Sequence, residues 1–219
     1  MRFDIKKAVV KTTQDKPTIY DVYILDASGS MNFQNKFSNA KQGIVENFEA
    51  SAQIQETNNI PVLCIFSYGN QRTISFGMKD CTKALNSARA TGGTALNDAI
   101  GNTINAIKSK LKESEKVIFK IFTDGQENSS YEFTYNQIAK LMQNCGKDWT
   151  FTFVGTSYDT QMCTNNYKLD KSNTLVHDNT GKGLEKAMER TRSAMQTYSA
   201  NVAMGKSVIT GFYNSKNDK

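Results

Sequence analysis

The sequence predicts an α/β fold: a doubly wound, mostly parallel central sheet with one antiparallel edge strand and helices on both faces. Strands and amphipathic helices alternate along the chain, which is the order that parallel sheets require. The strands are near-continuous apolar runs such as "TIYDVYILD" (18–26) and "EKVIFKIFTD" (115–124), typical of strands covered on both faces. Both of these strands end in an aspartate, at the sheet edge where open α/β folds bind ligands.

The first half of the chain supplies two buried strands, a helix and an edge strand. Apolar side chains recur at helical spacing from Lys36 to about Glu56, which predicts a helix. The run "QRTISFGM" follows the turn-like "YGN", so we expect it to pair antiparallel with the strand before it. The expected elements are a strand at 18–26, a helix at 36–56, a strand at 59–68 and an edge strand at 71–78.

The second half repeats the alternation. "TALNDAIGNTINAIKSKL" and the long segment from Gly183 to Met204 have amphipathic helical patterns, and "WTFTFVG" is an apolar strand ended by glycine. The expected elements are helices at 94–111, 134–145 and 183–204 and strands at 115–124, 149–155 and 174–177. We expect a single domain over 18–204, with 1–17 as an N-terminal extension or edge strand and 205–219 as a polar C-terminal tail whose last dozen residues are loose.

Composition excludes several classes of protein. The 219 residues are 38% hydrophobic and 22% charged, an ordinary globular balance that leaves room for a sizeable core. The net charge of +6 is spread along the chain, so we expect no nucleic-acid binding.

The cysteines and the apolar runs bear on the compartment. None of the four cysteines belongs to a C-x-x-C pair, which argues against a zinc site and for free thiols. No segment has the pattern of a signal peptide or a membrane span. We therefore expect a cytoplasmic protein that makes no contact with a membrane.

Oxygen-bearing side chains gather at the predicted carboxyl edge of the sheet. Asp26, Ser28 and Ser30 follow the first strand in "DASGS", Thr94 precedes a helix in "GGTAL", and Asp124 ends a later strand in "FTDGQ". Alone, each aspartate is more readily explained as a turn residue and Thr94 as a helix N-cap. Together, they form an oxygen-rich set that suits a hard divalent cation.

This ordered pattern resembles the von Willebrand factor A (vWA) family and its metal-ion-dependent adhesion site (MIDAS). The family pattern is D-x-S-x-S, then a threonine, then an aspartate, and "DASGS", Thr94 and Asp124 match all of it. The resemblance covers about residues 18 to 200 and is closest to compact intracellular bacterial and bacteriophage members. It implies a Rossmann-like vWA fold in which Ser28, Ser30 and Thr94 contact Mg²⁺, with Mn²⁺ as an alternative. Asp26 and Asp124 would act through water or through hydrogen bonds to the hydroxyls.

Such a site suggests how a partner is recognised. Neutral hydroxyl ligands leave the cation electrophilic, so a partner's Asp or Glu can replace a bound water. The resemblance thus implies a metal-dependent protein-interaction module rather than an enzyme. The expected rim around the metal comes from the flanking loops: Asn32, Phe33, Gly92, Gln126 and Tyr131.

Two other functions remain open at this stage. The first is a structural component of a larger assembly, such as a phage particle, with a metal that only stabilises the loops. The second is a metal-assisted phosphohydrolase with Asp26 as nucleophile, although Ser28 stands where haloacid-dehalogenase-like enzymes place a second acid. Lys36 and Lys120 are the lysines that such an enzyme could use. Asp98 and Glu127 are candidates for supporting or rim roles, and His177, the single histidine, is a weak candidate ligand.

Overall fold

A computed structural model describes residues 16–67, 73–124 and 126–214. Its strands form a single mixed sheet in the order β3-β2-β1-β4-β5-β6. All neighbours pair in parallel except β2 and β3, which are antiparallel. This confirms the predicted fold class, including the antiparallel edge strand. The strands are β1 (Thr18–Asp26), β2 (Asn58–Phe66), β3 (Thr73–Phe76), β4 (Lys116–Phe122), β5 (Trp149–Gly155) and β6 (Thr174–Val176).

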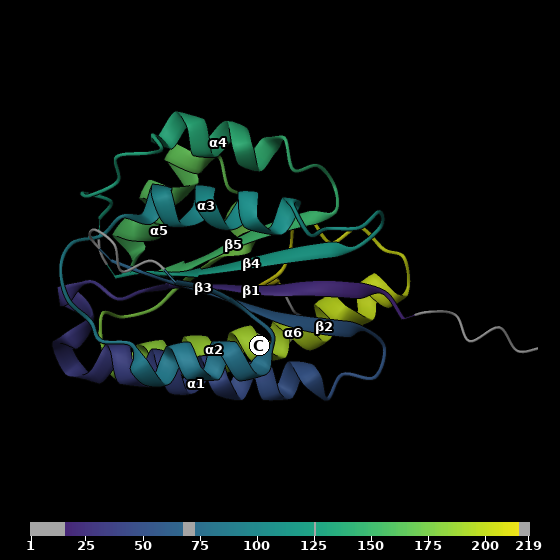
Figure 1. The fold of residues 1–219 in the computed structure, drawn as a ribbon, viewed down its shortest axis with the longest axis horizontal. Coiled ribbons are helices and arrows are strands. Elements are labelled where there is room, and N and C mark those ends of the chain that lie inside the picture. Colours follow the sequence, from purple (N-terminus) through teal and green to yellow (C-terminus); the bar gives the residue numbers. More distant parts are fainter. Residues whose placement is uncertain (1–15, 68–72, 125, 215–219) are drawn as a thin grey trace, which may run out of the picture.

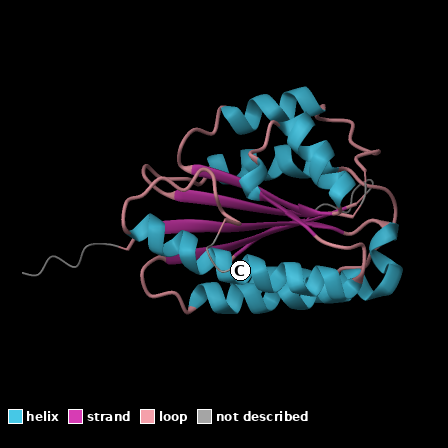
Figure 2. Cartoon of the chain, turned by 180° about the vertical axis from the view of Figure 1, so that it is seen from behind, coloured by secondary structure: helices cyan, strands magenta, loops and turns pink. Residues whose placement is uncertain are grey.

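Helices cover both faces of this sheet, as the alternating sequence pattern predicts. Helices α3, α4 and α5 lie on one face, and α1, α2 and α6 lie on the other (Figure 1). The same three layers are visible from behind (Figure 2). The helical elements are η1 (Gly29–Asn35), α1 (Lys36–Ala52), α2 (Met78–Ser87), α3 (Leu96–Lys108), α4 (Tyr135–Gln143), α5 (Ser157–Tyr167), η2 (Lys171–Asn173) and α6 (Gly181–Ala203).

The sheet separates two hydrophobic cores. Along β1, Tyr23 and Leu25 point into the core beneath α1 and α6, whereas Val22 and Ile24 point into the core beneath α3 and α4. This alternation is the period-2 geometry of a strand. Because both faces are covered, most side chains of β1 are apolar or aromatic, and Asp26 at its carboxyl end leads into the polar loop that follows.

The first core also holds an ion pair. Lys120 of β4 pairs with Asp21 of β1, and both side chains are fully buried. The Lys120 ammonium lies 4.1 Å from the centre of the Tyr23 ring, so the ring face gives it a second favourable contact. Lys120 therefore points into the core beneath α1 and α6, where its ammonium is paired with the Asp21 carboxylate.

Two helices were not expected from the sequence. α2 buries only Cys81 and Leu85, too few apolar positions to produce a strong helical period. α5 is mostly polar, with Cys163 and Tyr167 among its few buried residues. Its start does carry a local signal, since Thr156 and Asp159 form a capping box.

The described part of the expected C-terminal tail is not loose. Val208, Phe212 and Tyr213 are buried in the core beneath α6, and the Tyr213 hydroxyl lies 3.2 Å from the Thr191 hydroxyl of that helix. The prediction of a loose end is therefore wrong over 208–214, because three buried side chains among polar ones are enough to anchor the segment. Residues 68–72, 125 and 215–219 lie outside the described residues, as do residues 1–15, on which the expected N-terminal extension or edge strand falls.

The strand order places a switch point between β1 and β4. From β1 the chain runs outward to β2 and β3, then returns across the sheet to β4 and continues to β5 and β6. Loops leaving β1 and β4 therefore diverge in opposite directions, which opens a crevice at their carboxyl ends. Asp26 ends β1, and Asp124 lies two residues beyond the end of β4.

Candidate metal centre

Backbone hydrogen bonds bring two loops together at the carboxyl edge of β1. The Ala27 carbonyl accepts a 2.7 Å bond from the Thr91 amide, and the Gly29 amide donates a 2.9 Å bond to the Gly92 carbonyl. These bonds fix the loop that follows β1 against the loop that precedes α3. The sequence segments "DASGS" and "GGTAL" therefore lie side by side, as the site prediction requires.

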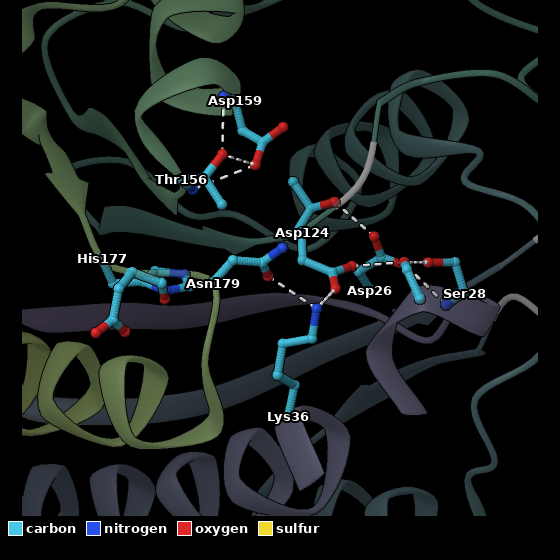
Figure 3. A network of polar contacts seen from close by, with 11 residues as sticks. Asp26, Ser28, Lys36, Asp124, Thr156, Asp159, His177 and Asn179 are labelled. Atoms are coloured by element: carbon cyan, nitrogen blue, oxygen red, sulfur yellow. Dashed lines mark hydrogen bonds and ion pairs between the residues drawn. The ribbon is translucent and has the colours of Figure 1, made fainter. Parts of the chain in front are cut away.

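Side-chain oxygens then form a continuous chain across the crevice. The hydroxyls of Ser28 and Ser30 lie 3.0 Å apart, and the Ser30 hydroxyl donates a 2.7 Å bond to Oδ1 of Asp124. Figure 3 shows this row running from the β1 loop to the end of β4. Residues 94 positions apart in the sequence are thus joined by a direct contact.

Asp26 lies beneath this row and supports it. Its Oδ1 accepts a 2.7 Å bond from the Ser28 amide, and its Oδ2 accepts a 2.5 Å bond from the Thr123 hydroxyl. The side chain is fully buried. Burial raises the pKa of Asp26 to about 6; the bonds from Thr123 and Ser28 oppose this rise, and the nearby Asp124 adds to it. Asp26 therefore acts through the loop that it orients.

Thr94 is placed by its backbone. It is 3% exposed, its amide donates a 3.0 Å bond to the Asn128 side chain, and its carbonyl accepts bonds from the amides of Asn128 and Ser129. Direct hydrogen bonds thus connect the other four predicted metal residues, while Thr94 joins the loop carrying Asp124 to the loop carrying Gly92.

A lysine that the sequence analysis did not place in the metal site reaches the same carboxylate. The Lys36 ammonium forms an ion pair with Oδ2 of Asp124, and both side chains are 3% exposed. It also donates a 2.9 Å bond to Oδ1 of Asn179, in the segment between β6 and α6. Figure 3 shows Lys36 rising from the first turn of α1 between these two acceptors. His177 lies nearby, but its Nδ1 contacts the Asp178 carbonyl.

Two acidic residues near the centre organise the loop after β4. Asp98 accepts bonds from the amides of Tyr131, Glu132 and Phe133. Glu127 accepts bonds from the amides of Asn97, Ser129 and Ser130 and from the Ser130 hydroxyl. These carboxylates accept bonds from amides of the loop and from an amide in the first turn of α3, where no intrahelical acceptor is available. Their role is to shape the loop that presents Tyr131.

The five predicted rim residues are all exposed at this edge: Asn32, Phe33, Gly92, Gln126 and Tyr131. Phe33 is 62% exposed and Tyr131 is 70% exposed. Asn32 is held by a 2.9 Å bond to the Ala90 carbonyl. Tyr158, at the start of α5, is 51% exposed and was missed. Because it follows β5 directly, its place at the carboxyl edge could have been inferred from the strand at 149–155.

A cavity of about 190 Å³ opens on the α3–α5 side of the centre. Thr123, Gln126 and Glu127 line it from the β4 side, and Tyr135 and Tyr167 from the helices. The cavity is large enough for one side chain. It adjoins Asp26 through Thr123, which donates its hydroxyl hydrogen to that carboxylate.

The residues fit a small divalent cation. The Ser30 hydroxyl lies within hydrogen-bond distance of both the Ser28 hydroxyl and one Asp124 oxygen, and hard cations such as Mg²⁺ take oxygen ligands. Ser28, Ser30 and Thr94 are the hydroxyl residues that could hold the ion, with Asp124 beside Ser30 as its carboxylate support. In the described part of the chain, no cluster of three or more His, Cys, Asp or Glu side chains has the arrangement of a metal site, so the hydroxyls are essential to this one.

No protein-family model and no curated protein sequence matches the chain. Solved structures do match it. They include a von Willebrand factor type A protein from Catenulispora acidiphila, at 15% identity and a TM-score of 0.59, over 83% of this chain and 43% of that one. They also include the pilus adhesin SpaC from Lactobacillus rhamnosus GG, at 13% identity and a TM-score of 0.65, over 84% of this chain and 31% of that one.

A third match concerns a metal site. Proximal thread matrix protein 1 from the mussel byssus, solved with a zinc-occupied MIDAS motif, matches at 15% identity and a TM-score of 0.60. The match covers 80% of this chain and 47% of that one. The chain thus spans less than half the length of these three structures. At these identities the matches establish that the chain has a vWA-like fold.

Proposed function

We propose that the carboxyl edge of β1 and β4 is a metal-ion-dependent adhesion site. It would bind Mg²⁺, or Mn²⁺ in its place, through Ser28, Ser30 and Thr94, with Asp26 and Asp124 supporting the ion. The observation that carries this proposal is the unbroken row from Ser28 through Ser30 to Asp124, at the switch point of a vWA-like sheet. The mussel protein with zinc in its MIDAS supports a divalent ion at such a place.

The bound ion would capture an acidic residue of a partner protein. Hydroxyl ligands neutralise little of the ion's charge, so an Asp or Glu of the partner can complete the coordination in place of water. One such bond is too weak for a specific complex, and surrounding contacts must exclude water. Phe33 and Tyr131 supply exposed aromatic surface for this purpose.

The chain itself would carry out no chemistry. Asp26, the candidate nucleophile of the enzyme alternative, is fully buried, and each of its oxygens accepts a hydrogen bond. Lys120 is buried with Asp21, and Lys36 is paired with Asp124. The candidate nucleophile and both candidate lysines are thus engaged with other groups, which disfavours the phosphohydrolase alternative.

A structural role in a larger assembly, such as a phage particle, differs from this proposal in what the metal does. In that case the ion would only stabilise the loops, and binding of a partner would not depend on it.

None of the helices in the described part of the chain is both long and apolar enough to cross a membrane. The four cysteines are free, which is consistent with the cytoplasmic location that we propose.

The test is affinity capture of a partner with the full chain in Mg²⁺, repeated in excess chelator and with Ser28→Ala. We expect both changes to release the partner. Neutralising one acidic residue of the recovered partner should have the same effect. A partner that stays bound with undiminished affinity in chelator would show that the metal serves only stability.

A further inference from the structure

Lys36 occupies a position that needs an explanation. It is the first residue of α1, where the positive end of the helix dipole disfavours a cation. It is also buried, at 2% exposure, and lysines are almost never buried without a partner. The Asp124 carboxylate supplies that partner through Oδ2. The same carboxylate accepts a bond from the Ser30 hydroxyl through Oδ1. Lys36 therefore lies at the Asp124 end of the row of oxygens that begins at Ser28.

The backbone before Lys36 is bent to place it there. Gln34 and Asn35 have φ angles of +51° and +59°, a left-handed conformation that side-chain-bearing residues adopt at a cost. Gly181 at the start of α6 lies directly against the Gln34 carbonyl, because a Cβ on that glycine would come within 2.3 Å of it. This close packing supports the turn. Two successive residues thus keep a costly backbone conformation, and this conformation directs the Lys36 side chain toward Asp124.

We propose that Lys36 is a built-in counter-cation of the metal site and competes with the divalent ion for Asp124. The inference rests on the proposed metal site. Without metal, Asp26 and Asp124 bring two carboxylates close together, and the ammonium offsets one of these charges. A divalent ion that arrives must share Asp124 with this cation or displace it. Lys36 therefore lowers the affinity for metal while stabilising the metal-free site.

The alternative is that Lys36 is only a structural ion pair. In that case its removal would weaken the fold and leave the affinity for metal unchanged, or would lower the affinity by disordering the Asp124 loop. The counter-cation account predicts the opposite direction. Removing a positive charge near the ion should tighten binding by about tenfold to a hundredfold, from the repulsion of two charges a few ångströms apart.

The experiment measures Mg²⁺ and Mn²⁺ affinity by titration calorimetry on the full chain. Lys36→Met keeps the length and apolar stem of the side chain and removes the charge. Asn179→Ala removes the second acceptor of the ammonium. Because an ammonium displaced from Asp124 then loses its alternative acceptor, this variant should bind metal more weakly than the native chain. Lys186→Met is the matched control, because Lys186 is an exposed lysine on α6 and its removal should leave the affinity unchanged.

The outcomes separate this inference from the proposed function. Tighter metal binding by Lys36→Met than by the native chain supports the inference. If only the variant binds metal, the inference is still supported, but the proposed function of the native chain fails. If the native chain binds metal and Lys36→Met binds it equally or more weakly, the inference is overturned and the proposed function stands. Binding by neither protein overturns both. If Lys36→Met does not fold, Asn179→Ala with native or higher affinity overturns the inference.

Discussion

The hydroxyl of Ser30 donates a 2.7 Å hydrogen bond to Oδ1 of Asp124, joining the loop after β1 to the loop after β4. On its other side Ser30 lies 3.0 Å from the hydroxyl of Ser28. The serines therefore belong to an arrangement that spans the switch point of the sheet. A local turn would not require either contact.

The buried Asp26 should make stability depend on pH when metal is removed. Its pKa is about 6 in the folded chain, against 3.8 as the ordinary value. Its contribution to stability is therefore full below about pH 3.8 and is lost as the pH rises through 6. The loss amounts to about 3 kcal/mol, at 1.36 kcal/mol per pKa unit.

Asp26→Asn isolates this contribution. In chelator at pH 7.5 we expect the variant to be more stable than the native chain by up to about 3 kcal/mol, and the advantage should shrink toward zero near pH 4. Denaturant unfolding at the two pH values measures the difference. An equal difference at both values would mean that Asp26 does not titrate in this window.

Asp98 should be a major support of the loop after β4. Its carboxylate accepts three backbone bonds, and its side chain is fully buried. Asp98→Ala leaves three amides without their acceptor and should cost about 3–4 kcal/mol. Asp98→Asn keeps one acceptor oxygen and should cost less. Thermal unfolding checks the order; equal losses would indicate that packing, and not the acceptor, matters.

The exposed aromatic residues should act on partner binding and not on metal binding. We expect Phe33→Ala and Tyr131→Ala each to weaken a captured partner by about 1–2 kcal/mol, a typical loss for an interface aromatic. Metal affinity should stay within twofold of native. Met204→Ala is the matched control, since Met204 is a comparably exposed apolar residue on the far end of α6. A loss as large in that control would mean the effect is not specific to the rim.

The purified chain should hydrolyse no phosphoester or nucleotide above background in Mg²⁺ or Mn²⁺. The reason is that Asp26 is buried with both oxygens bonded, so it cannot reach a substrate. Metal-dependent turnover that survives repeated purification and disappears in Asp26→Asn would contradict this prediction and restore the enzyme alternative.

The fold was largely predictable because its strands are long and apolar and its main helices strongly periodic. β1 and β5 have the bounds that the sequence predicts. α5 was missed because its sequence is polar along most of its length, and hydrophobic period was the signal that the prediction used. Val208 and Phe212 were missed for a related reason, because isolated apolar residues in a polar segment carry no periodicity.

The residues of the candidate site likewise fall into those that the sequence predicts and one that it does not. Asp26, Ser28, Ser30 and Asp124 could be predicted because they follow strands whose carboxyl ends must meet. Lys36 could not, since its placement depends on the left-handed turn at Gln34 and Asn35 and on the packing of Gly181 against it. A sequence pattern for the metal residues contains neither feature.

The measurement that tests the account most directly is thermal unfolding of the native chain in chelator and in saturating Mg²⁺, with Ser28→Ala measured in parallel. At a hundredfold excess over the dissociation constant, a bound ion stabilises the fold by about 2.7 kcal/mol. For a chain of this size that raises the Tm by about 5–10 °C. The account predicts this shift in the native chain and its loss in Ser28→Ala. Equal melting curves for the native chain with and without Mg²⁺, and likewise with Mn²⁺, would contradict it.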